Sequence, residues 1–331
     1  MKLHLAAILV VLWAEKPERQ APRLDAAPAR PQPGAIVRLT LSSPLKKGDS
    51  IVAIRGSLAG EPLHFIVAAR GSWHAIGGIP ADAVGTLSAR AFLSYRSGRV
   101  DTVSVAMKLP PIPLVKAEPL AVDSSFSKPM DSETTDRINR DNARARAVGR
   151  ASHDSPPLWT AAFLPPRSSV ITSPFGTGRV FNGAVTSRHL GIDFRGAVGD
   201  TIKAANRGVV ALVDTFYLAG TVVYIDHGAG VATGYFHMSK PLVAKGDTVG
   251  RGQVIGLVGH TGRVTGPDLH WAARYGPITV NPGDLLTLDP AWYPRKHPTI
   301  PPSHHPTNPP IHLMIPNVPQ LITQNIGDGV R

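Results

Sequence analysis

Two short segments of the chain hold side chains that bind metals in proteins. The first contains His189 and Asp193, four positions apart, and the second contains Asp268 and His270, two positions apart. The glycines and β-branched residues around them favour strands, on which residues i, i+2 and i+4 point to the same face. We therefore expect His189 to converge with Asp193, and Asp268 with His270. Two imidazoles and a carboxylate suit an open catalytic zinc site, where three protein ligands leave one position for water.

The composition limits what else such a site can contain. The chain has 331 residues and no cysteine, so disulfides and cysteine-based zinc or redox sites are excluded, and a metal must be held by His, Asp or Glu. A hydrophobic content of 43% is ordinary for a globular protein, and the length allows two or three domains. The 32 glycines and 32 prolines are typical of β-rich chains with short segments.

The chain is strongly basic, with a formal net charge of +12. Such a charge favours anionic partners, either nucleic acid or an acidic polymer of the cell envelope, although solubility alone also explains it. No basic run is interleaved with aromatic residues, so we do not expect a nucleic-acid partner.

The first residues carry a targeting pattern. Residues 3–14 form an apolar run after Lys2 that is too short to span a bilayer as an ordinary helix. The run resembles the core of a secretory signal, so residues 1–14 are predicted to be a signal or anchor segment. This predicts export to the periplasm, the cell envelope or the extracellular medium, with membrane contact only through this segment.

The composition and the alternation of apolar residues divide the rest of the chain. Residues 15–34 are rich in Pro, Ala and Arg and are predicted to be a linker. Residues 35–110 contain short alternating segments typical of a small β-sandwich. Residues 111–157 are expected to be a second linker that contains a polar helix over 131–148, with Gly149 as its stop. A helix this polar must lie across a surface.

A second β-rich block covers residues 158–290, and no long amphipathic helix interrupts it. The Pro- and His-rich residues 291–331 show little periodicity and are predicted to be disordered. The expected fold class is therefore mainly β, with an N-terminal β-sandwich-like domain followed by a C-terminal domain built on an antiparallel β-sheet.

Four motifs follow one another in the second block. They are Ser-Pro-Phe-Gly at 173–176, His-Leu-Gly-Ile-Asp-Phe at 189–194, Gly-Tyr-Phe-His-Met-Ser at 234–239 and Thr-Gly-Arg-Val-Thr-Gly-Pro at 261–267. In this order they resemble the M23 peptidases, the lysostaphin and LytM type of zinc endopeptidase, over roughly residues 158–290. The resemblance implies the antiparallel β-sheet peptidase domain of that family.

The resemblance also implies a site and a reaction. His189, Asp193 and His270 match the ligands of one Zn²⁺ ion, and His237 matches the catalytic histidine of the family. The implied activity is a zinc metalloendopeptidase that hydrolyses peptide crosslinks of bacterial peptidoglycan through a zinc-activated water, with His237 stabilising an oxyanion or relaying a proton. A basic protein would be attracted to that anionic mesh.

One position departs from the family pattern. The family has His-x-His where this chain has Asp268-Leu269-His270. Asp268 has three open roles: it acts as the general base, it orients a neighbouring group, or it closes the zinc site as a fourth and inactivating ligand. An ionised Asp268 also cancels the remaining positive charge of zinc with Asp193, which would weaken stabilisation of an oxyanion. The alternative to an active enzyme is therefore a weakened or inactive LytM-type module that binds peptidoglycan or activates another cell-wall hydrolase.

Three further residues are candidates for substrate binding. The planar guanidinium groups of Arg188 and Arg263 are suited to substrate carboxylates, and the ring of Tyr235 is suited to the wall of a peptide groove. Ordinary solvated arginines and a packing tyrosine are the competing interpretations.

Overall fold

The computed structural model describes residues 21–44, 48–112, 118–122, 131–181 and 185–288. The predicted signal or anchor segment at 1–14 and the predicted disordered tail at 291–331 lie outside the described residues. Within the described ranges, no helix is both long enough and apolar enough to cross a membrane.

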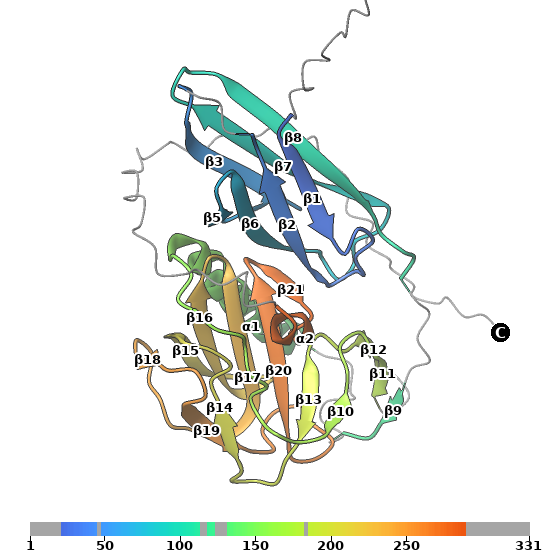
Figure 1. Cartoon of the computed structure of the whole chain (residues 1–331). Helices are drawn as coiled ribbons and strands as arrows, with labels where there is room; N and C mark the ends of the chain where they lie inside the picture. Colours follow the sequence, from blue (N-terminus) through green and yellow to red (C-terminus); the bar gives the residue numbers. More distant parts are fainter. Residues whose placement is uncertain (1–20, 45–47, 113–117, 123–130, 182–184, 289–331) are drawn as a thin grey trace, which may run out of the picture. The chain divides into compact units, whose positions relative to one another are not determined.

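The N-terminal part consists of two four-stranded sheets that share one apolar core (Figure 1). The first sheet has the order β1 (Arg23–Ala27), β2 (Ile36–Ser42), β6 (Ser72–Gly78), β5 (Ile66–Ala69). The second has the order β4 (Glu61–Pro62), β3 (Ile51–Leu58), β7 (Thr86–Tyr95), β8 (Val100–Lys108). The alternation of side chains along β7 shows how one face of a strand enters this core. Ala89, Ala91 and Leu93 are fully buried, while the residues between them are exposed.

Strand β1 lies inside residues 15–34, where the composition predicted a linker. Its five residues pair antiparallel with β2, and Leu24 is buried in the shared core. The Pro- and Ala-rich composition hid this strand because only one large apolar side chain marks it. Pairing with a neighbour, which composition does not report, makes the segment a strand.

Helix α1 (Ser132–Ala151) occupies the polar segment and runs beyond the expected range of 131–148. Asp131 begins the helix, because its carboxylate accepts a hydrogen bond from a first-turn backbone N–H at 2.7 Å. Gly149 does not end the helix. It is buried at a close approach to the carbonyl of Gly276, where any Cβ would collide with that backbone oxygen. The expected helix stop at Gly149 is therefore wrong. A glycine stands here because the packing leaves no room for a side chain, and the sequence alone does not distinguish this case from a helix end.

The C-terminal part is built on a ten-stranded sheet, and the mainly β prediction with antiparallel sheets is confirmed. Its main path is β10 (Ile171–Ser173), β13 (Ile192–Arg195), β20 (Asp268–Tyr275), β17 (Val231–Pro241), β16 (Gly220–Gly228), β15 (Gly208–Phe216), β18 (Thr248–Val249). Strands β14 (Thr201–Lys203), β19 (Val254–Val258) and β21 (Ile278–Val280) pair at its margins, and helix α2 spans Gly283–Leu286. A small three-stranded sheet has the order β12 (Val185–Arg188), β11 (Gly178–Phe181), β9 (Glu118–Leu120).

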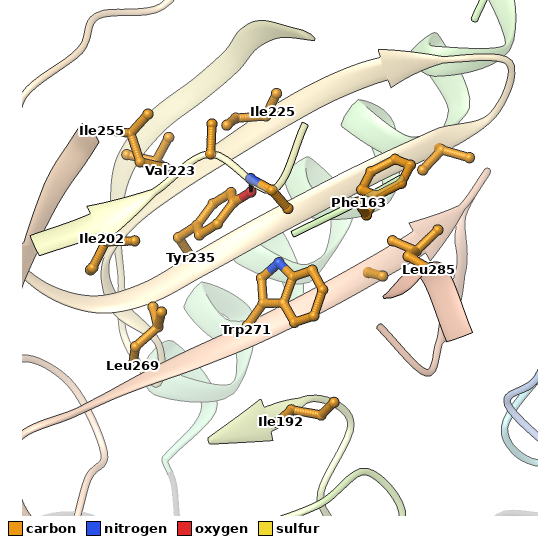
Figure 2. Close-up of a cluster of buried hydrophobic side chains, with 14 of the residues drawn as sticks. Phe163, Ile192, Ile202, Val223, Ile225, Tyr235, Ile255, Leu269, Trp271 and Leu285 are labelled. Carbon is orange, nitrogen blue, oxygen red and sulfur yellow. Dashed lines mark hydrogen bonds between the residues drawn. The ribbon is translucent and has the colours of Figure 1, made fainter. Parts of the chain in front are cut away.

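One face of the large sheet holds the main apolar core. Tyr235 on β17 pairs across the strands with Trp271 on β20, and neither has exposed surface. Figure 2 shows both rings pointing into a cluster of isoleucine, valine and leucine side chains. Burial of such aromatic residues contributes about 2–3 kcal/mol each, so this face is fixed by packing.

The opposite face of the same strands carries the polar residues of interest. Phe236 and His270 are cross-strand partners and therefore share this face, one residue along from the Tyr235 and Trp271 pair. Part of the face is covered by α1, where Ala145 packs in a cluster with Tyr224. The helix contacts β15, β16, β17 and β20.

The buried His227 on β16 makes the stability of the fold depend on pH. The Nδ1–H of His227 donates to the carbonyl of Arg207 at 2.8 Å, and its Nε2 lies 2.8 Å from the hydroxyl of Thr233. Burial lowers the pKa of His227 to about 4, with the bond to Arg207 acting in the opposite direction. The folded protein therefore holds this imidazole neutral at neutral pH.

We predict that His227 makes the protein less stable in acid. The unfolded chain takes up this proton near pH 6.5 and the folded chain only near pH 4, so the stabilisation is complete above 6.5 and is lost as the pH falls toward 4. In His227→Gln, the free energy of unfolding should depend on pH less steeply across this window, by up to ~1.4 kcal/mol per pH unit. Urea unfolding at several pH values measures both slopes, and equal slopes would contradict the assignment.

Candidate metal-binding active site

His189 does not share a strand with Asp193. It lies between β12, which ends at Arg188, and β13, which begins at Ile192. The expectation that both residues stand on one strand is therefore wrong, because the chain bends at Gly191. The bend still brings the two side chains together, since Nε2 of His189 lies 2.9 Å from Oδ1 of Asp193.

Three side-chain atoms converge on one point. Oδ1 of Asp193 lies 2.8 Å from Nδ1 of His270, and that nitrogen lies 2.9 Å from Nε2 of His189. Asp193 and His270 are cross-strand partners on β13 and β20 and therefore face the same side of the sheet. Strand pairing thus joins residues that are 77 positions apart in the sequence.

The ring of His189 is fixed by its other nitrogen. Nδ1 lies 3.0 Å from the carbonyl oxygen of Pro174 and 3.3 Å from the hydroxyl of Ser173. A carbonyl only accepts, so Nδ1 carries the proton and Nε2 presents a lone pair toward Asp193. Histidines that ligate metals are commonly oriented in this way by a backbone carbonyl.

Asp193 divides its two oxygens between two kinds of partner. Oδ1 meets the imidazoles, while Oδ2 accepts a hydrogen bond from Nη2 of Arg179 on β11. Burial alone would raise the pKa of Asp193, but its interactions with His189 and His270 hold the pKa far below its usual range. The carboxylate is therefore ionised, and Arg179 leaves only Oδ1 to face the point of convergence.

This donor set fits a divalent cation. His189, Asp193 and His270 are the group of metal-binding side chains found within the described residues, with ligand atoms that lie within 4.8 Å of one another. A tetrahedral zinc ion with bonds of about 2.0–2.1 Å would separate its ligand atoms by roughly 3.3 Å. The observed separations of 2.8–2.9 Å need an expansion of only a few tenths of an ångström.

Gly191 makes room for the ring of His270. A Cβ at position 191 would lie 2.5 Å from Cε1 of His270 and 2.7 Å from the backbone oxygen of Trp271. The second contact is with the backbone of β20, so it cannot be relieved by a change of rotamer. Any larger residue would push β20 away from the bend that holds His189.

His237 reaches the site through an unusual backbone conformation. In a regular strand it would face away from Phe236, toward the core. Its φ of 60° is in the left-handed region that non-glycine residues rarely adopt. Both rings therefore approach His270, with centroid distances of 5.1 Å for Phe236 and 6.0 Å for His237.

The protonation of His237 follows from its surroundings. Nδ1 lies 2.8 Å from the carbonyl of Thr261 and must donate to it. Burial, with the nearby charge of His270, lowers the pKa of His237 to about 3. At neutral pH the imidazole is thus neutral, and its Nε2 is the nitrogen able to accept a proton.

Asp268 lies beside the converging atoms without joining them. Its Oδ1 is buried and has no hydrogen-bond partner in the described parts of the chain. Burial raises the pKa of Asp268 to about 7, helped by the charge of Asp193 and opposed by Arg179. A carboxyl group with this pKa can both take and give a proton near neutral pH.

These groups surround a cavity of about 190 Å³. Its lining consists of Leu120, Thr172, Ser173, Arg179, Asp193, His237, Arg263, Val264, Thr265 and Asp268. A potential metal ligand, a proton acceptor and a carboxyl group thus face one space, which is the arrangement that hydrolysis of a polar bond requires.

The three predicted substrate-binding residues lie in three different places. Arg263 lines the cavity beside Asp193, whereas Arg188 lines a separate cavity of about 500 Å³ together with Phe175. Tyr235 has no exposed surface, and its hydroxyl accepts a hydrogen bond from the backbone of Ala205 at 2.8 Å (Figure 2). The predicted substrate-binding role of Tyr235 is therefore wrong, because strand alternation points its ring into the core.

Two residues of the site were missed from the sequence. Arg179 follows Gly176 by three positions, and nothing local marks it as a partner of Asp193. Thr261 was noted only as part of a motif, yet its carbonyl holds His237 and its hydroxyl contacts the backbone of Met238 at 3.0 Å. Both contacts form only when separate segments of the folded chain come together, so the sequence carried no separate signal for them.

The sequence of this region matches a known family. The model of peptidase family M23 matches residues 187–282. The chain is 48% identical over 83 residues to the peptidoglycan DD-endopeptidase ShyA of Vibrio cholerae, which is 25% of this chain and 19% of that protein. It is 42% identical over 113 residues to the DD-carboxypeptidase/endopeptidase Mpg of Neisseria meningitidis, which is 34% of this chain and 26% of that protein. The chain thus spans about a fifth to a quarter of the length of these relatives.

A crystal structure is similar over a larger part of the chain. It is that of a protein assigned to peptidase M23 from Pseudomonas aeruginosa, with a TM-score of 0.57 and 27% sequence identity. The similarity covers 78% of this chain and 95% of that chain. It therefore extends to the N-terminal sheets as well as to the large sheet.

We predict that Gly191→Ala weakens metal binding more than it weakens the fold. The added methyl group separates His189 from His270, so affinity for zinc should fall by about 10–100-fold, as when outer contacts of a metal site are lost. Competition with a chromophoric chelator measures this affinity. Gly250→Ala is the matched control, because the closest atom to its Cβ would be 3.9 Å away. Equal affinities in the two variants would contradict the role of Gly191.

Proposed function

We propose that this chain is a peptidase of family M23, whose model matches residues 187–282, and that it is a zinc metalloendopeptidase that hydrolyses peptide crosslinks of bacterial peptidoglycan. The observation that carries the proposal is the convergence of Asp193, His189 and His270 at 2.8–2.9 Å, beside a cavity that His237 also lines. The names of ShyA and Mpg support the substrate, because both are described as peptidoglycan or DD-peptide hydrolases.

His189, Asp193 and His270 would hold the metal through Nε2, Oδ1 and Nδ1. Zinc bound there supplies a Lewis acid that polarises a water molecule and a peptide carbonyl. The protein's part is to keep the three ligand atoms in place: Pro174 fixes the ring of His189, and Arg179 fixes the carboxylate of Asp193.

Asp268 is the residue we assign as general base. It lines the cavity next to Asp193, and its pKa, raised to about 7 chiefly by burial, is suited to proton exchange at neutral pH. Its carboxylate would take the proton of the attacking water and return it to the leaving amine. This hypothesis is preferred to a fourth metal ligand, because Asp268 lies outside the converging group.

We assign to His237 the stabilisation of the negative charge that develops on the oxygen of the scissile carbonyl. Its Nδ1–H is held by the carbonyl of Thr261, so a proton shared with the cavity must be carried on Nε2. A proton that Asp268 passes on from the attacking water would be held at Nε2, where it donates a hydrogen bond to the oxyanion before it returns to the leaving amine. A fixed ring needs no reorganisation during the reaction, which is the advantage of its left-handed backbone.

Export of the chain is also proposed. The apolar run at residues 3–14 and the net charge of +12 support a location in the periplasm or cell envelope, where the anionic polymer is found. Anionic envelope polymers are the additional partners we propose for this charge.

The test is the release of soluble peptides and new amines from purified peptidoglycan in the presence of zinc. The native chain should be active, and a chelator should abolish the activity. Asp268→Asn and His237→Ala should each lower kcat by about 10²–10⁴-fold, the usual contribution of a proton-transfer group. Asp247→Asn, at an exposed turn, is the matched control and should keep full activity.

The alternative function is a weakened or inactive module that binds peptidoglycan or activates another hydrolase. Asp268 is the observation that favours it, since a carboxylate stands where the family has histidine. A silent native chain that sediments with peptidoglycan, and that Asp268→His makes active, would establish this alternative. Full activity of Asp268→Asn would instead show that Asp268 is not the base.

A further inference from the structure

A tight turn lies behind His237, and it is held by a helix to which the proposed function gives no part. The turn consists of Tyr217, Leu218 and Ala219 and joins β15 to β16. The backbone N–H of His237 donates to the carbonyl of Ala219 at 2.9 Å. The turn therefore fixes the backbone of His237, while the carbonyl of Thr261 fixes its ring.

The loop that carries Thr261 rests on the same turn. The N–H of Arg263 donates to the carbonyl of Leu218 at 2.8 Å, and Oγ1 of Thr261 accepts a hydrogen bond from a backbone N–H of β16 at 2.9 Å. A Cβ at Gly262 would lie 2.6 Å from the oxygen of Leu218, so only glycine permits this approach. The hydrogen bond to the backbone of His237 and the one to its ring thus both depend on the position of the turn.

The carboxylate of Asp141 on α1 anchors this turn. Its Oδ2 accepts a hydrogen bond from the backbone N–H of Tyr217 at 2.8 Å. Tyr217 is the first residue of the turn, and successive peptide planes are joined by only two soft dihedral angles per residue. The bond to Asp141 therefore restricts the directions in which the carbonyl groups of Leu218 and Ala219 point.

A carboxylate is a costly side chain at this position. Asp141, Ala145 and Gly149 are the buried residues of α1, and both Ala145 and Gly149 are small and apolar. A buried carboxylate destabilises a protein unless it is hydrogen-bonded, so packing alone would favour an apolar residue here. The hydrogen bond to the turn accounts for the carboxylate.

Two arginines of α1 contact the end of the same hairpin. Arg137 and Arg144 stand four positions before and three positions after Asp141, spacings that place side chains on one face of a helix. The guanidinium carbon of Arg137 lies 5.8 Å from the ring centre of Tyr217, and that of Arg144 lies 5.7 Å from the ring centre of Phe216. The helix thus holds the hairpin by its side chains and, at Asp141, by its backbone.

We propose that Asp141 is a positioning residue that holds His237 in its catalytic orientation through the turn at residues 217–219. This inference rests on the proposed function, in which His237 stabilises the oxyanion. Helix α1 precedes residues 187–282, which match the family model, so part of the support of the active site comes from outside that region. Loss of the anchor would let the turn shift, and a displacement of about 1 Å can lower the rate by about 100-fold.

The test compares three variants of the full-length, zinc-loaded chain. Asp141→Ala removes the hydrogen-bond acceptor, while Asp141→Asn keeps an oxygen that can accept the same bond. Ala145→Gly is the matched control, because it weakens the helix and its packing one helical turn away without removing the bond to Tyr217. The readouts are cleavage of a soluble crosslinked peptide prepared from peptidoglycan and amide hydrogen exchange followed by NMR.

In Asp141→Ala, kcat should fall by about 10–100-fold while KM changes by less than about 3-fold, because the peptide still binds but the oxyanion is poorly stabilised. Asp141→Asn should keep at least about a third of the native kcat, since its amide oxygen replaces the acceptor. Ala145→Gly should keep the native kcat even though its melting temperature falls, as that of Asp141→Ala does.

Hydrogen exchange measures the anchor without any turnover. The amide protons of His237 and Arg263 donate to the turn and should exchange about 10–100-fold faster in Asp141→Ala, the loss expected for one hydrogen bond to a charged group. In Asp141→Asn and Ala145→Gly, both amides should keep their native exchange rates to within about 3-fold.

A native kcat in Asp141→Ala would overturn the inference, and so would a loss of kcat without faster exchange at His237. An equal loss of kcat in Ala145→Gly would also overturn it, because the docking of the helix rather than the bond to the turn would then be responsible. A native chain that cleaves nothing would reject the proposed function. The exchange rates alone would then decide whether Asp141 holds His237 in place.

Discussion

The carboxylate of Asp193 is the group on which the rest of the site depends. One oxygen meets two imidazoles and the other meets Arg179, so three side chains from separate segments are held by a single charge. An ionised carboxylate that is this deeply buried is costly unless every lone pair has a partner. Two further contacts keep the imidazoles within reach of that oxygen. The carbonyl of Pro174 holds the ring of His189, and the absence of a side chain at Gly191 leaves room for the ring of His270.

The side chains of the site are placed by regular strand alternation, except at His237, where the alternation is broken. Regular alternation along β17 and β20 buries Tyr235 and Trp271 on one face and sets Phe236 against His270 on the other. His237 breaks that alternation with a left-handed φ, so two consecutive residues contact the same face. Such a conformation persists only where the surroundings determine it, and here the backbone of Thr261 holds the ring.

Asp268 places a carboxyl group in a cavity that two arginines also line. Arg179 lies close enough to lower the pKa of Asp268, while burial and Asp193 raise it. The balance leaves a carboxyl group with a pKa near neutrality in a cavity that Asp193, Arg179 and Arg263 also line. In the function we propose, this pKa lets Asp268 exchange protons with water at neutral pH.

The sequence by itself determined the β class, the identity of the motif residues and the absence of cysteine ligands, because alternation and residue type are local properties. It did not determine that β1 pairs with β2, that Gly149 serves packing, or that His189 lies in a bend rather than on a strand. The pairing of β13 with β20 decided which residues meet, and alternation placed Tyr235 in the core rather than in a groove. Arg179 had no local signal at all, because its role comes only from a carboxylate 14 positions away, beyond strand β12. Long-range contacts of this kind depend on strand register, and register is set by the packing of the whole sheet.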